Sequence, residues 1–120
     1  MMSIRDALHD LHHAITARGC FVMLHDGDLV AATLGARRRA DEVSGLTSFL
    51  TVTLNRVLEE VHMGSFQSFG MRSDHGDVLV VDLGESYLVI LADPATGLHV
   101  SMPEIREAAQ RLGRLSKIPI

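Results

Sequence analysis

The chain has 120 residues, of which 47% are hydrophobic and 22% charged, and its formal net charge is -4. This length fits one domain, residues 1–120, around a single core, and the composition is that of a folded protein rather than a disordered one. The negative charge argues against nucleic-acid binding, which requires a concentrated positive surface. With one cysteine, no secretory signal pattern and no apolar run of about 18 residues, the sequence predicts a cytoplasmic protein without direct membrane insertion.

The N-terminal region predicts an amphipathic helix over residues 3–18. Its apolar side chains recur at helical spacing on one face, and the other face is charged and rich in histidine. Ser3 is a typical N-cap residue, and Gly19 suits the left-handed conformation that ends many helices. We therefore expect one face of this helix to lie on the core and the helix to end just before Gly19.

A β-hairpin is predicted next. Two short runs of apolar and β-branched residues, 20–24 and 29–33, are joined by the sequence His25-Asp26-Gly27-Asp28. Asp-Gly between two such runs is the strongest short-range hairpin signal. The polar stretch 35–40 is predicted to be a link.

A long helix over residues 41–63 carries apolar side chains on two faces. The wider stripe predicts the face that packs on the core and consists of Val43, Leu46, Leu50, Leu54, Val57, Leu58 and Val61. A narrower second seam lies roughly opposite and consists of Phe49, Val52 and Met63 with Arg56. Leaving this seam in water forgoes about 5 kcal/mol, which favours a partner surface. The alternative is that scattered surface hydrophobes are ordinary and need no partner.

The C-terminal half predicts three strands and a helix. Residues 66–72 form the weakest strand, with Phe69 and Met71 on one side and Phe66 on the other. The runs 78–83 and 87–92 are almost continuously apolar, which is typical of inner strands joined by a tight turn. The last helix is introduced by Ser101-Met102-Pro103-Glu104, a capping-box sequence with proline near the first helical position.

These elements predict an α/β chain of the α+β type, in the order α-β-β-α-β-β-β-α. Two antiparallel strands followed by three more make one five-stranded antiparallel sheet. Because the inner strands lack polar alternation, helices must cover both faces of this sheet.

The element order and several sequence stretches resemble the roadblock/dynein light-chain family. The stretches are Gly19-Cys20-Phe21-Val22-Met23-Leu24 leading into Asp26-Gly27-Asp28, the long second helix, and Tyr87-Leu88-Val89-Ile90-Leu91 before the end helix. They are patterns of apolar residues and glycines that cover nearly the whole chain, and no invariant motif is matched residue by residue. Longin-like and profilin-like domains also have a helix-covered antiparallel sheet and remain alternatives.

The resemblance implies a dimer in which the second helices of two protomers lie antiparallel and the third strands pair edge to edge. Bacterial members of this kind are commonly partners of small Ras-like GTPases, and eukaryotic relatives are dynein light chains or scaffolds. Carried over by element, the dimer or partner surface would comprise Phe49, Val52, Arg56, Met63, Phe66, Phe69 and Met71. We expect Phe49 and Val52 nearer the dimer seam and Arg56 nearer its rim.

The sequence gives only weak indications of a catalytic site or a metal site. The run Arg37, Arg38 and Arg39 suggests an arginine finger for phosphoryl transfer, but a solvated charge run is the simpler interpretation, and the family's activators act on the GTPase's own switch residues. His9, His12 and His13 share the outer half of the first helix, where two imidazoles could meet one metal, but the site would be open.

The remaining reactive residues also have structural explanations. Cys20 is predicted to be a small buried hydrophobe, and His25 belongs to a turn without a nucleophile beside it. No nucleotide-binding glycine motif occurs, and we expect no cofactor.

The sequence therefore predicts a non-enzymatic homodimeric regulator or scaffold that binds a small Ras-like GTPase and modulates its activity. A second hypothesis is a scaffold or sensor subunit that assembles with signalling or motor components and does not affect hydrolysis. A third is a small-ligand or metal-binding domain, for which the histidine face is the only indication.

Overall fold

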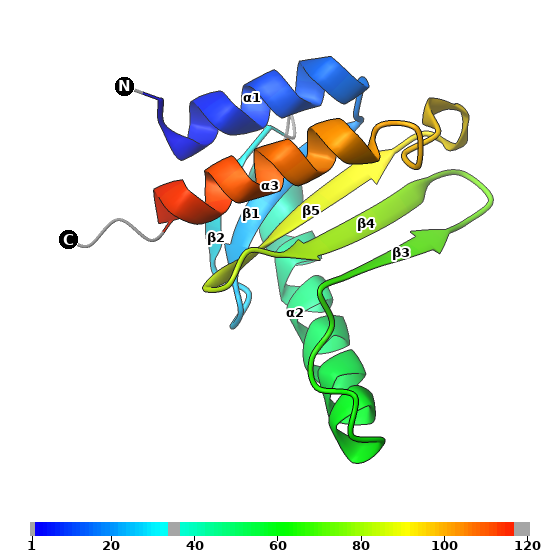
Figure 1. Ribbon diagram of the computed structural model, residues 1–120. Helices are drawn as coiled ribbons and strands as arrows, with labels where there is room; N and C mark the ends of the chain where they lie inside the picture. Colours follow the sequence, from blue (N-terminus) through cyan, green and yellow to red (C-terminus); the bar gives the residue numbers. More distant parts are fainter. Residues whose placement is uncertain (1, 34–36, 117–120) are drawn as a thin grey trace.

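The computed structural model describes residues 2–33 and 37–116 and confirms the predicted element order (Figure 1). A short 3-10 turn, Pro94–Thr96, is the one addition within the described residues. The helices are α1 (Ile4–Ile15), α2 (Arg37–Glu60) and α3 (Met102–Ser116), and the strands are β1 (Gly19–Leu24), β2 (Leu29–Ala32), β3 (Ser68–Arg72), β4 (Asp77–Asp82) and β5 (Ser86–Ala92).

The five strands form one antiparallel sheet in the order β2-β1-β5-β4-β3. The central strand is β5, which pairs with β1 from Gly19 opposite Leu91 to Leu24 opposite Ser86, and with β4 on its other side. The prediction that β4 and β5 are inner strands is therefore confirmed. The edges of the sheet are β2 and β3, so the outer edge of each has no strand partner among the described residues.

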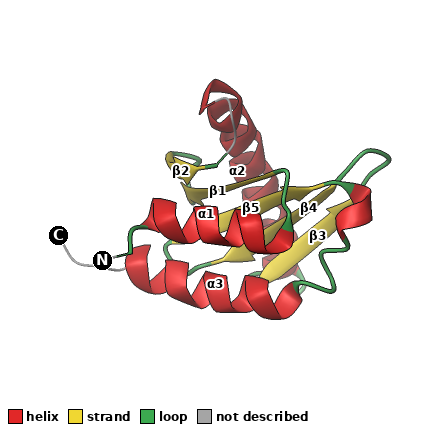
Figure 2. Cartoon of the chain, turned by 90° about the horizontal axis from the view of Figure 1, so that it is seen from above, coloured by secondary structure: helices red, strands yellow, loops and turns green. Residues whose placement is uncertain are grey.

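Helices lie on both faces of the sheet, as the continuous apolar strands predict. Figure 2 shows α1 and α3 side by side on one face, with α2 on the opposite face. Successive residues of β1 and β5 point to opposite faces of the sheet. Val22 and Ile90 pack with α1 and α3, while Phe21 and Val89 lie in the apolar cluster that includes α2 side chains. Two apolar layers thus sandwich the sheet.

Helix α1 begins as predicted and ends earlier. Ser3 caps the helix through a reciprocal capping box with Asp6, and hydrogen bonds from the backbone and side chain of Ser3 lower the pKa of the Asp6 carboxyl. The left-handed exit is Thr16, at φ 53°, and not Gly19, which instead begins β1 and pairs with Leu91. Gly19 is therefore part of the sheet, and the helix ends at Thr16, three residues before it.

Helix α2 begins four residues before the predicted start, so part of the predicted link is helical, and it ends three residues early. His62 adopts φ 60° after the last turn, and the amide of Met63 donates to the carbonyl of Leu58. In Figure 1 the C-terminal half of α2 projects beyond the sheet, and residues 61–67 return beside it to β3. Across the described residues, no helix has both the length and the apolar character needed to cross a membrane.

Candidate functional site

The face of α2 that meets the sheet carries small and polar side chains. Ala40, Ser44, Ser48 and Thr51 are buried there, and farther along Leu54 and Leu58 are half-buried. The Ser48 hydroxyl donates to the backbone carbonyl of His25 at 2.8 Å. Small side chains let the helix approach the β1–β2 turn closely, because a Cβ at Gly27 would lie only 3.1 Å from the Cβ of Ser48.

Asn55 anchors the C-terminal part of α2 to the rest of the protein. Its side-chain amide donates to the Tyr87 hydroxyl at 3.3 Å, and its carbonyl oxygen accepts from the backbone amide of Phe66 at 3.0 Å. The Tyr87 ring stacks on Phe66 and lies 4.3 Å from the ring of His25, whose Nε2 is 3.5 Å from Asp82 Oδ1. These contacts set the rotation of α2 about its own axis.

That rotation turns much of the predicted core face of α2 away from the sheet. Much of the predicted core stripe is exposed: Leu46 is 74% exposed, Leu50 43%, Val57 55% and Val61 56%. Within that stripe, Val43, Leu54 and Leu58 are half-buried and contact the core. The core prediction was wrong for four of its seven residues, because hydrophobicity alone favoured the side with the largest side chains and the contacts of the small residues decided otherwise.

The predicted second seam is exposed as well. Phe49 is 76% exposed, Val52 54% and Met63 71%, and Arg56 is also exposed. Within the described residues Arg56 has no ion pair. We call the exposed set the α2 apolar surface; it consists of Leu46, Phe49, Leu50, Val52, Val57, Val61 and Met63.

The three predicted site residues near β3 differ in accessibility. Met71 is 50% exposed and Phe69 is half-buried, both on the edge strand. Phe66 is only 7% exposed, and its ring packs edge-to-face on Phe69 at 5.0 Å. The strand begins at Ser68, so Phe66 precedes it and shares one apolar cluster with Phe69, against the prediction of opposite sides. Phe66 is therefore a core residue.

The residues considered for chemistry lie apart from one another or serve the fold in the described part of the chain. No group of three or more His, Cys, Asp and Glu residues there is placed to hold a metal ion. His12 turns inward and its Nδ1 lies 2.9 Å from Thr33 Oγ1, while burial, followed by His13 and His9, lowers its pKa. Cys20 is fully buried, and burial raises the pKa of its thiol to about 12, which agrees with the predicted structural role. The side chains of Arg37, Arg38 and Arg39 lie outside the described residues.

Known proteins were compared with the chain by sequence and by structure. No protein-family profile matches. Two uncharacterized proteins of Methanocaldococcus jannaschii, MJ1340 and MJ0310, are each 28% identical over 105 residues, covering 88% of this chain and 92% of each relative. MglB of Myxococcus xanthus has a TM-score of 0.88 at 16% identity, covering 95% of this chain and 94% of MglB. The chain has the roadblock fold.

Further roadblock structures agree with this assignment. The Roadblock/LC7 domain of Streptomyces avermitilis has a TM-score of 0.82 at 14% identity, covering 92% of this chain and 95% of that domain. An MglB structure with a tetrameric arrangement has a TM-score of 0.85 at 17% identity, covering 93% and 86%. Profilin II of Acanthamoeba castellanii reaches only 0.59 at 14% identity, covering 95% and 99%, so the profilin-like alternative fits less well. The resemblance found in the sequence is thus confirmed as a likeness of fold.

Proposed function

We propose that this protein is a homodimeric roadblock-type regulator or scaffold that binds a small Ras-like GTPase and has no catalytic site of its own. The α2 apolar surface carries the proposal, because contiguous apolar patches on a protomer mark interaction sites. Covering Leu46, Leu50, Val57 and Val61 in both protomers would contribute about 10 kcal/mol before the loss of translational and rotational freedom on association. That is enough to support a stable dimer interface.

Two observations support the dimer. Leu46, Leu50, Val57 and Val61 follow one another at spacings of four, seven and four, so they form a straight stripe suited to a partner helix. Strand β3 leaves its outer edge unpaired among the described residues, and a free edge is a template for another strand. An antiparallel α2 pair with β3 joined to its copy uses both surfaces at once, as the family resemblance implies.

The partner surface lies on the flank of the same helix. Phe49, Val52 and Arg56 recur on α2 at spacings of three and four, beside the straight stripe, and Met63 follows the end of the helix. With the stripe assigned to the dimer, this flank stays open, so α2 can serve both contacts. This assignment revises the expectation that Phe49 and Val52 lie nearest the dimer seam, because the four stripe residues now fill that seam.

The proposed mechanism is a population shift of the bound GTPase. A dimer that binds one switch conformation more tightly than the other favours that conformation by its differential affinity. The regulator then needs no catalytic group of its own. Modulation of hydrolysis follows if the favoured conformation is the competent one.

The test combines binding with oligomeric state. Small Ras-like GTPases encoded by the source genome are loaded with GDP or with a non-hydrolysable GTP analogue, and their binding to the purified protein is measured. We expect binding that depends on the nucleotide, with the Phe49→Asp and Arg56→Glu variants binding about tenfold more weakly while remaining dimeric. Equal or no binding in both nucleotide states would refute the regulatory role. Binding without any effect on hydrolysis would identify a scaffold.

A further inference from the structure

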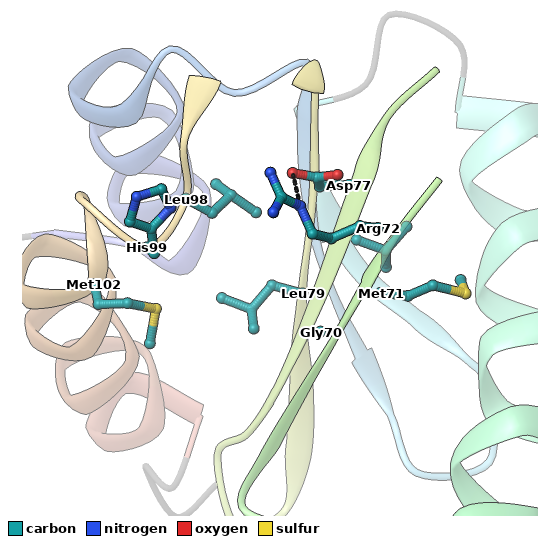
Figure 3. A pocket seen from close by; sticks show the side chains of 9 residues that line it. Gly70, Met71, Arg72, Asp77, Leu79, Leu98, His99 and Met102 are labelled. Carbon is teal, nitrogen blue, oxygen red and sulfur yellow. Dashed lines mark ion pairs between the residues drawn. The ribbon is translucent and has the colours of Figure 1, made fainter. Parts of the chain in front are cut away.

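A pocket of about 560 Å³ lies on the face of the sheet opposite α2. It is bounded by β3, β4 and the segment that leads into α3, and its volume is in the range of small-molecule sites. Figure 3 shows Leu79 on the sheet side and Leu98, His99 and Met102 on the α3 side, while Met71 points away toward α2. The pocket is therefore separate from the α2 apolar surface.

The pocket has an apolar wall and one carboxylate, that of Asp77. Leu79 and Leu98 are buried, and Met102 is half-buried. Gly70 contributes no side chain, and this leaves the floor of the pocket open at β3. Asp77 is 9% exposed as a residue and lines the same pocket. An apolar body with one charged group would match this lining.

The carboxylate of Asp77 lacks a strong partner. Within the described residues it accepts no hydrogen bond, and its single ion-pair contact, with Arg72 Nε, is 3.9 Å long. That distance exceeds a hydrogen bond, and the Arg72 side chain is 81% exposed, so water screens the pair. The oxygens of this carboxylate are not closed off from water, so a cation that enters the open pocket can reach them.

We propose that this pocket binds a small amphipathic amine, with its ammonium group on Asp77 and its apolar body against Leu79, Leu98 and Met102. A primary alkylamine is protonated at pH 7, as lysine is, and donates the short charge-assisted hydrogen bonds that Asp77 lacks. Arg72 lies at the rim and competes with the ammonium for the carboxylate. The site lies on the other face of the sheet from the α2 apolar surface, and its β3 residues adjoin the edge that we propose to pair with a second copy.

The proposal is tested by titrating the full chain with n-hexylamine. Binding is measured by calorimetry and by the changes in backbone amide chemical shifts. We expect saturable binding with shifts confined to the pocket, and affinity that rises about fourfold per methylene from butylamine to heptylamine. Asp77→Asn should weaken binding about tenfold or more, because the neutral amide loses the charge-assisted bond. Gly70→Val should block the pocket, since an added Cβ meets only Leu79 and Val78 at 3.7 Å and the strand tolerates it.

Two controls separate an amine site from other sites. Arg72→Met removes the competing cation and should strengthen hexylamine binding, whereas loss of binding would contradict the assignment. Hexanoate has the same length and the opposite charge and should bind at least about tenfold more weakly. Preferential hexanoate binding that Arg72→Met abolishes would show an anion site instead. The proposal would be overturned if hexylamine caused no backbone amide shifts in the wild-type protein. It would also be overturned if the Asp77→Asn and Gly70→Val variants both showed the same amide shifts as the wild type.

Discussion

Replacing Leu46 with aspartate should separate the proposed dimer into folded protomers. Leu46 is 74% exposed in the protomer, so the fold depends little on its side chain. If a partner helix covers that exposed part, each copy contributes about 1.5 kcal/mol, and a symmetric dimer contains two copies. Losing about 3 kcal/mol raises the dimer dissociation constant about 100-fold, and burying a carboxylate in the seam adds to this cost.

Sedimentation equilibrium over a concentration series measures this change directly. Val100→Asp is the matched control, because Val100 is 72% exposed and lies before α3, away from α2. We expect the control to keep the wild-type dissociation constant, and the Leu46→Asp monomer to unfold cooperatively as a folded protein. A Leu46→Asp protein that dimerises as tightly as wild type would refute the assignment of the stripe. Dissociation of both variants would show that the effect is one of added charge and not of the seam.

Three further predictions concern the contacts that position α2 and α1. Gly27→Ala should lower the free energy of unfolding in urea by about 2 kcal/mol, because Gly27 has φ +99° and its new Cβ would meet Ser48 at 3.1 Å. Gly45→Ala is the contrasting variant. Nothing lies within 4 Å of its new Cβ, so it should stabilise the helix by about 1 kcal/mol. Asn55→Ala should cost about 1–3 kcal/mol in the same assay, because it leaves the amide of Phe66 and the Tyr87 hydroxyl without their partner, and an unchanged midpoint would exclude Asn55 as the anchor. The pKa of His12 is lowered from 6.5, chiefly by burial, so the unfolded chain binds more protons there and stability should fall as pH drops through 6.5 toward the folded-state pKa. His12→Gln should reduce that loss, and identical pH profiles of urea unfolding would contradict this assignment.

Local chemistry accounts for the parts of the fold that the sequence predicts correctly. Asp26-Gly27 closes the hairpin because Gly27 can adopt a positive φ, and Ser3 starts α1 because its hydroxyl satisfies a free backbone amide. The apolar runs that became β4 and β5 indicate strands that are buried on both faces, because they carry few polar side chains that need to reach water. These signals depend on neighbours a few residues away.

The predictions from sequence are wrong where contacts between distant segments of the chain determine the local structure. At Gly19 the chain could end a helix or begin a strand, and pairing with Leu91 selected the strand. Phe66 was expected within β3, but the bond from its amide to Asn55 holds it before the strand and in the core. Pairing and side-chain anchoring between segments far apart in the chain are invisible to a local pattern.

By itself, the sequence determined the order of helices and strands and the presence of more apolar side chains on α2 than the sheet can cover. Only the tertiary structure decided which face of α2 remains open. Ser44, Ser48 and Thr51 allow close approach to the sheet, and Asn55 fixes the helix rotation, so Leu46, Leu50, Val57 and Val61 turn outward. Amphipathic periodicity locates the apolar faces of a helix, but the fit of small side chains against the sheet selects which face is buried.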